Sequence, residues 1–224
     1  MIKNISNLGD AALYCDFGNE VNKETNSLVI KYFRMIQKEN IESINNLTPS
    51  YNKLIISFDL KKTCYKDMKT LIENLNVDIN NDLSNKKIEV PVCIDESFAL
   101  DIKELEKKLK LSREKFYENF FNKEFFCYMT GFIAGMPFLG DLDKKMRAKR
   151  LETPRVKVPK GSVGVTEQFA NVYTFESPGG WNIVGNTPLN IFDSSKEINP
   201  NLINPGDAIV FKQITKDKHQ NYNE

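Results

Sequence analysis

The stretches TPRVKVPKGSVGV (153–165) and SPGGWNIVGNTPLNIFD (177–193) decide the fold of this chain. Both consist of short apolar pieces separated by glycine, proline and asparagine, and pieces of the same kind flank them at 124–132 and 207–214. Many short strands with turn residues between them are typical of a closed or nearly closed β-barrel. Eight of the 11 glycines lie between Gly131 and Gly185, which predicts a shaped, loop-rich surface in this part of the chain.

Working outward, the first 90 residues combine two hydrophobic periods. Alternation over 13–17 predicts a half-buried strand, and i, i+4, i+7 spacing predicts a helix over about 22–40. Two strands over about 43–48 and 53–60, a second helix near 68–75 and a fourth strand over 88–94 follow. This β-α-β-β-α-β order predicts a ferredoxin-like domain.

Between the two parts, residues 98–121 have helical spacing. Ile102, Leu105 and Leu109 form one stripe, and Ser112 is a candidate N-cap for a second short helix. We therefore predict an α+β protein. Residues 1–90 form the ferredoxin-like domain, and residues 91–224 form a helical connector and the barrel, with a tail that lacks order from about 215.

Composition excludes several function classes. With 41% hydrophobic residues, 27% charged residues and a net charge of +1, the chain is typical of a globular protein without bulk attraction to nucleic acid or anionic membrane. It has no apolar run long enough to span a bilayer and no signal-peptide pattern, so we predict a cytoplasmic protein.

Residues for familiar catalytic and metal sites are scarce. The four cysteines are single and widely spaced, which predicts free thiols and no zinc site. His219, the only histidine, lies in the polar tail, where we expect it to be solvated, so a histidine-based triad or metal site is not predicted. No phosphate-binding glycine motif of the GxxxxGK[ST] or GxGxxG type is present.

Several separated segments carry a family resemblance. They are GDAALYCDFG (9–18), VPVC (90–93), GFIAGMPFLGDLD (131–143), the two opening stretches and NPGDAIVFKQI (204–214). In order and spacing these segments resemble the KipI/allophanate hydrolase subunit 1 family, over nearly the whole chain. The resemblance implies a ferredoxin-like domain followed by a cyclophilin-like barrel.

The resemblance also implies work within a complex. In that family the subunit pairs with a larger homologous subunit and a third, hydrolase-like subunit, and the set opens 5-oxoproline to glutamate with ATP as co-substrate. Related domains form the carboxyltransferase portion of urea carboxylase, and the KipI member inhibits a sensor kinase. An enzyme subunit and an interaction protein are therefore both open.

The chain departs from the family pattern at three places. Ala134 and Met136 replace a proline and a phenylalanine of the usual GFxPGF motif, and Phe120 stands where a histidine is common. Of the usual pair of Pro-Arg motifs, the second survives as Pro154 and Arg155, whereas the first is altered to Ala148, Lys149 and Arg150.

Candidate binding residues gather in the glycine-rich part. Arg155 is suited to holding a carboxylate or phosphate with two hydrogen bonds, and a structural role is the equal alternative. The PGGW turn offers backbone N–H groups to an oxyanion or lactam oxygen, or else it is a tight turn with Trp181 in the core. The candidate substrate-binding set is Arg155, Ser162, Tyr173, Gly179, Gly180, Trp181, Asn186 and Thr187.

Two further surfaces are predicted. Between Asp141 and Lys160, eight basic residues face three acidic ones, a bias that could attract an anionic substrate or phosphorylated intermediate, although such runs are often solvated loops. An apolar loop with Phe132, Met136 and Phe138 is the candidate partner interface.

Overall fold

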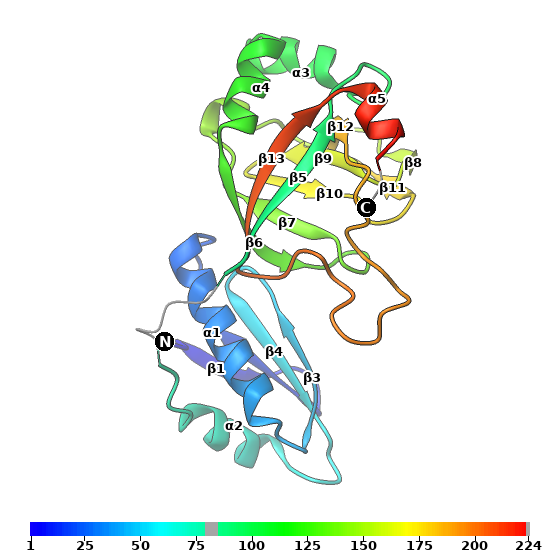
Figure 1. The fold of residues 1–224 in the computed structure, drawn as a ribbon. Coiled ribbons are helices and arrows are strands. Elements are labelled where there is room, and N and C mark those ends of the chain that lie inside the picture. Colours follow the sequence, from blue (N-terminus) through cyan, green and yellow to red (C-terminus); the bar gives the residue numbers. More distant parts are fainter. Residues whose placement is uncertain (79–84, 223–224) are drawn as a thin grey trace. The chain divides into compact units, whose positions relative to one another are not determined.

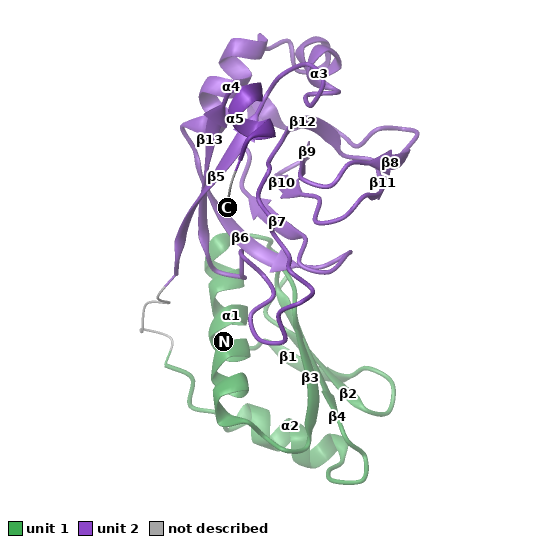
Figure 2. Cartoon of the chain, turned by 45° about the vertical axis from the view of Figure 1, so that its right-hand side comes forward, with its two compact units in different colours: residues 1–84 green, residues 85–224 purple. Residues whose placement is uncertain are grey.

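The computed structural model describes residues 1–78 and 85–222 and divides into two compact units, residues 1–84 and 85–224 (Figures 1 and 2). The first unit is an antiparallel sheet with two helices, and the second contains a closed β-barrel. The predicted α+β class, with one barrel unit, is confirmed. None of the helices in the described ranges is long and apolar enough to cross a membrane.

The first unit is a four-stranded sheet in the order β1-β2-β4-β3 with helices α1 and α2. Buried side chains from β2, β4 and both helices form its core. Asn22 caps the long helix, because its side chain accepts a hydrogen bond from the Thr25 N–H at 2.9 Å. The bounds are β1 Asn4–Asn7, β2 Ala12–Asp16, α1 Lys23–Glu39, β3 Ile44–Pro49, β4 Lys53–Phe58 and α2 Tyr65–Glu73.

The predicted element order of this unit is wrong at one edge of the sheet. The fourth strand of a split β-α-β fold would follow the second helix and lie beside the first strand. Here β1, from the start of the chain, takes that edge and pairs antiparallel with β2. The predicted strand over 88–94 is a strand, β5 (Lys87–Cys93), but it belongs to the barrel, so the boundary lies at 84/85 instead of 90.

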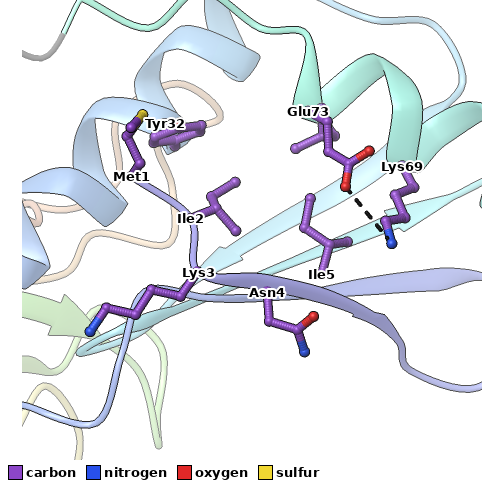
Figure 3. Close-up of a pocket in the computed structure, with 9 residues that line it drawn as sticks. Met1, Ile2, Lys3, Asn4, Ile5, Tyr32, Lys69 and Glu73 are labelled. Carbon is purple, nitrogen blue, oxygen red and sulfur yellow. Dashed lines mark ion pairs between the residues drawn. The ribbon is translucent and has the colours of Figure 1, made fainter.

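A small hollow of ≈ 240 Å³ lies beside β1 (Figure 3). Ile2, Ile5 and Ile72 contribute apolar lining, and Lys69 and Glu73 of α2 form an ion pair with 3.8 Å between Nζ and Oε1. Because the Glu73 carboxylate is already paired with Lys69, this hollow offers little for catalysis. The candidate site residues lie in the second unit.

The barrel of the second unit closes in the order β10-β7-β6-β13-β5-β12-β9. β5 and β13 run parallel, and the other neighbours in the barrel run antiparallel. Aromatic rings fill one side of the core, where Phe120 of α4 stacks on Phe211 of β13 at 4.9 Å. The strand bounds are β6 Glu124–Thr130, β7 Pro137–Gly140, β9 Ser162–Thr166, β10 Phe169–Val172, β12 Asn182–Asn186 and β13 Ala208–Ile214.

Further helices and a ribbon lie around the barrel. The two helices predicted over 98–121 are present as α3 (Ile102–Leu109) and α4 (Arg113–Phe121), and the Ser112 side chain caps α4 through the Lys115 N–H. They do not connect the two units as predicted, because both follow β5 within the barrel unit. A two-stranded ribbon of β8 (Arg155–Val158) and β11 (Ser177–Gly179) projects from the barrel (Figure 1). The tail differs from the prediction, because residues 216–220 form a short helix, α5 (Lys216–Gln220), capped by Thr215.

Candidate functional site

The ribbon β8–β11 and the turn that follows it carry the glycine-rich wall of the candidate site. Gly179 pairs with Arg155 across the ribbon, and the Gly180 carbonyl accepts a hydrogen bond from the Leu151 N–H at 2.7 Å. Gly180 also lies against Arg150, since a Cβ built on it would be 3.3 Å from the Arg150 Nη2 atom. The PGGW turn therefore contacts the chain at both Arg150 and Arg155.

Tyr173 is the buried centre of this wall. A Cβ built on Gly179 would overlap its hydroxyl, so only glycine leaves room for the ring. The pKa of Tyr173 is raised by burial, and hydrogen bonds from the Asn171 side chain and the Trp181 backbone oppose that shift. Tyr173 thus stays a neutral phenol at physiological pH.

Trp181 packs into a small core that is separate from the main barrel core. It is 9% exposed and meets Phe138 edge to face at 5.6 Å. Its cluster also contains Met136, Val158 and Ile183. Two interpretations were open for the PGGW turn, a substrate-binding turn or a tight turn with Trp181 in the core. The geometry favours the second, because the indole packs in the small core.

Arg155 is partly buried and held by an ion pair. Its Nη1 and Nη2 atoms donate to both oxygens of Asp101, at 2.9 and 2.5 Å, and the Asp101 side chain is only 6% exposed. Asp101 Oδ2 also accepts the Ile183 N–H at 2.6 Å. Because this carboxylate already takes the bidentate geometry of the guanidinium, the predicted anion-binding role of Arg155 gives way to its structural alternative.

Ser162, Asn186 and Thr187 form a second group on the neighbouring strands β9 and β12. Asn186 faces Ser162 in the register, and its amide donates to the Lys160 carbonyl at 2.9 Å. The Thr187 N–H donates to the Gly161 carbonyl at 2.8 Å. Tyr173 joins the two groups, because its backbone N–H donates to the Ser162 carbonyl at 2.9 Å.

His219 reaches this second group, so its predicted place in solvent is wrong. Its Nε2 atom lies 2.8 Å from Asn186 Oδ1, and its ring packs on Phe98 in a tilted arrangement with 4.4 Å between the ring centroids. Since the Asn186 amide nitrogen points to the Lys160 carbonyl, the amide oxygen faces the imidazole and Nε2 carries the proton. Burial lowers the pKa of His219, which favours this neutral form.

The predicted partner interface divides into three environments. Phe132, at the tip of the β6–β7 loop, is 74% exposed with a positive φ of 70°. Met136 is 1% exposed inside the small core, so its assignment to an exposed interface is wrong. Phe138 is partly buried against Trp181. Of these three side chains, Phe132 is the one presented as a contact surface would require.

The site thus combines backbone donors, a neutral tyrosine and nearby cations. Within residues 1–78 and 85–222 no three histidine, cysteine, aspartate or glutamate side chains converge as metal ligands. His219 is engaged by Asn186, which leaves it unavailable as a base for the Ser162 hydroxyl. The arrangement is a hydrogen-bonded, mostly buried wall bordered by the cationic side chain of Arg150.

Sequence reasoning missed Asp101 and Asn171. Asp101 directly precedes α3, where an aspartate reads as an ordinary N-cap, yet it makes no capping bond and instead holds Arg155. Asn171 lies inside β10, and its Oδ1 accepts the Gly164 N–H at 3.1 Å. An asparagine within an apolar strand was the available signal for a buried hydrogen-bonding role.

Comparison with known proteins identifies the family. The model for the carboxyltransferase domain, subdomains C and D, matches residues 3–203. This chain belongs to that carboxyltransferase C/D family. The B subunit of the 5-oxoprolinase of Bacillus subtilis is 31% identical, and the alignment covers 98% of this chain and 96% of that protein.

Longer proteins contain the same C/D region. The crystal structure of TTHA0988 superposes with a TM-score of 0.83 at 26% identity over 92% of this chain, which spans only 40% of that chain. The urea amidolyase of Saccharomyces cerevisiae is 22% identical over 93% of this chain, which spans 13% of the enzyme. The carboxyltransferase C/D region therefore occurs both as a separate chain and as part of larger ones.

Proposed function

We propose that this protein is a non-autonomous subunit of an ATP-dependent 5-oxoprolinase, which opens the lactam of 5-oxoproline to give L-glutamate. The observation that carries the proposal is the end-to-end similarity to the B subunit of a 5-oxoprolinase. A cytoplasmic location follows from this function. Catalysis would need other subunits, a larger homologous one and a hydrolase-like one.

The geometry of the site supports a binding role for this protein. The wall of Tyr173, Gly179 and Gly180 is buried and closely packed, so it would serve as the rigid backing of a site for the lactam. Ser162, Asn186 and Thr187 lie on the adjoining strands, beside Trp181, and we retain them as candidate substrate contacts. Arg155 is left out of the set because Asp101 engages it.

The need for partner subunits is supported by two observations. The C/D region is fused to further sequence in TTHA0988 and in urea amidolyase, which suggests that a separate C/D chain associates with what those proteins carry in one chain. Phe132 is a large apolar side chain at a loop tip, the kind of residue that partner binding would cover.

The decisive experiment is an assay of the native complex that co-purifies with this chain. ATP hydrolysis is measured with and without 5-oxoproline, and glutamate is followed as product. Stimulation by 5-oxoproline with matching glutamate release is the expected result. A complex that hydrolyses ATP but ignores 5-oxoproline contradicts the substrate assignment.

A second function is favoured by the family itself. The matching model describes a carboxyltransferase domain, and urea amidolyase contains a similar region. In this alternative the chain contributes to transfer of a carboxyl group to an amide nitrogen. Supplying urea in place of 5-oxoproline in the same assay, with bicarbonate and ATP, separates the two functions.

A further inference from the structure

A basic hollow lies next to the glycine-rich wall, and the function proposed above has assigned no role to it. Its volume is ≈ 620 Å³, and it is lined by the end of α3 and by the segment 147–152. Four cationic side chains and one carboxylate surround it, with Leu109 and Ala148 as apolar lining. The charged residues are Lys108, Arg147, Lys149, Arg150 and Glu152.

Many cations elsewhere on the surface form ion pairs, such as Lys103 with Glu96 and Lys115 with Glu118. Within the described parts of the chain, none of the four in the hollow forms an ion pair, not even with Glu152. Four cations around one carboxylate repel one another more than that single counter-charge offsets, and a bound anion would reduce the repulsion.

The backbone of this segment is fixed, unlike that of a solvated charged loop. The Ala148 carbonyl accepts the Glu167 N–H at 2.6 Å, and the Lys149 carbonyl accepts Asn182 Nδ2 at 3.0 Å. Asn182 is fully buried, and the Leu151 N–H is bonded to Gly180. The arginines and lysines therefore project from a rigid base, which reduces the entropy lost when a ligand is bound.

From this geometry we infer that the hollow binds a small, multiply charged phosphoryl anion. Arginine forks match phosphate oxygens in pairs, and lysines add point charges. Several cations against one carboxylate favour a ligand with more than one negative charge. The volume admits a group larger than one phosphate, and the apolar lining could accommodate an organic portion.

This inference deepens the proposed function, on which it rests for the natural ligand, because an ATP-dependent lactam opening involves phosphoryl species. The site itself can be tested without turnover. If the chain binds the anion but its complex does not open 5-oxoproline, the proposed reaction is contradicted and the proposed anion site is not. If the complex opens 5-oxoproline but this chain binds no phosphoryl anion, only the proposed anion site is contradicted.

The test is equilibrium dialysis of the full chain with radiolabelled pyrophosphate, with orthophosphate and ATP as separate competitors. We expect saturable binding near one pyrophosphate per chain, weakened by added salt. Stronger competition by ATP than by orthophosphate would indicate a nucleotide source, and the reverse an inorganic one. Absence of saturable binding at millimolar pyrophosphate would overturn the proposal.

Matched variants locate the site. Lys149→Gln and Arg150→Gln should each weaken pyrophosphate binding about tenfold, the loss of one charge-assisted contact. Lys115→Gln removes the same charge from an exposed ion pair on α4 and should leave affinity unchanged. Equal losses in all three variants would mean nonspecific attraction and contradict the assignment. Unchanged urea unfolding midpoints show that the variants are folded.

Discussion

Arg150 and Arg155 stand five positions apart on the same side of the site, yet the protein uses them in opposite ways. Arg155 is paired in bidentate geometry with the buried Asp101, which in turn holds the β12 backbone at Ile183. Arg150 is exposed, contacts the Gly180 turn and forms no ion pair with any described residue. The first charge maintains the wall, and the second is available to a ligand.

The difference teaches that an arginine cannot be assigned to a substrate from its type and its neighbouring proline. A carboxylate distant in the sequence decides the matter, here Asp101, 54 positions before Arg155. Where such a partner is present, the guanidinium acts as structure. Four sets of variants test this contrast between the two arginines, from the largest expected effect to the smallest.

Removing the partner of Arg155 should have the largest effect. Asp101→Ala leaves a partly buried guanidinium and the Ile183 N–H without their acceptor, so we expect a loss of about 2 to 3 kcal/mol in the free energy of unfolding. Urea denaturation measures it. Asp95→Ala removes a 39% exposed carboxylate that accepts hydrogen bonds from Ser97 and Lys216, and it should cost clearly less because that carboxylate is solvated. Equal costs would contradict the structural role of the Asp101–Arg155 pair.

The adjacent glycines of the turn should differ in the same sense. A Cβ on Gly179 meets the hydroxyl of the buried Tyr173, so Gly179→Ala should destabilise the protein by about 1 to 3 kcal/mol. At Gly180 the nearest atoms belong to the exposed side chain of Arg150, which can move, so Gly180→Ala should cost below about 0.5 kcal/mol. Thermal unfolding of the pair of variants checks this order.

Arg150 itself should matter little for stability. The Arg150 side chain is exposed and forms no ion pair with a described residue. We therefore expect Arg150→Ala to change the free energy of unfolding by no more than about 0.5 kcal/mol. Arg155→Ala strands the buried Asp101 carboxylate and should cost more than about 1 kcal/mol. The two variants are compared by urea denaturation in one buffer. A reversed order would exchange the roles given to the two arginines.

The smallest effect concerns His219, which is hydrogen-bonded to Asn186 as a neutral side chain, whereas Arg155 is held by an ion pair. Burial lowers its pKa in the folded protein, so the unfolded chain binds the proton more readily. The stabilisation is present above the ordinary histidine pKa of about 6.5 and is lost as the pH falls through the folded value. Hydrogen exchange of α5 should therefore be faster at pH 5.5 than at pH 7.5, once the intrinsic exchange rates are divided out.

A control isolates this histidine. Asp95, which pairs with Lys216 of the same helix, has a pKa far below its usual range because of the hydrogen bond from Ser97, and so it stays ionised throughout this window. His219→Gln keeps a hydrogen-bond donor and cannot titrate, so its exchange in α5 should lose the pH dependence beyond the intrinsic rate. If the dependence persists, another group is responsible.

Much of the architecture was predictable because local patterns agree with the fold. The period of α1, the alternation of β4 and the Ser112 cap each reflect burial or backbone chemistry within a few residues. The edge strand β1 was missed because NISN has one buried residue and little alternation. β5 was placed in the wrong unit because a strand pattern indicates that a segment pairs, without indicating its neighbour.

By itself the sequence determined the two-unit α+β class, the helices α1 to α4, the barrel and, through its separated motifs, the family. Only the tertiary structure decided which charges are free. It paired Arg155 with Asp101, buried Met136, placed His219 against Asn186 and left the cations around Arg150 without ion pairs among the described residues. The reason is physical: periodicity and turn chemistry act over a few residues, whereas the state of a charge depends on groups that folding brings close from anywhere in the chain.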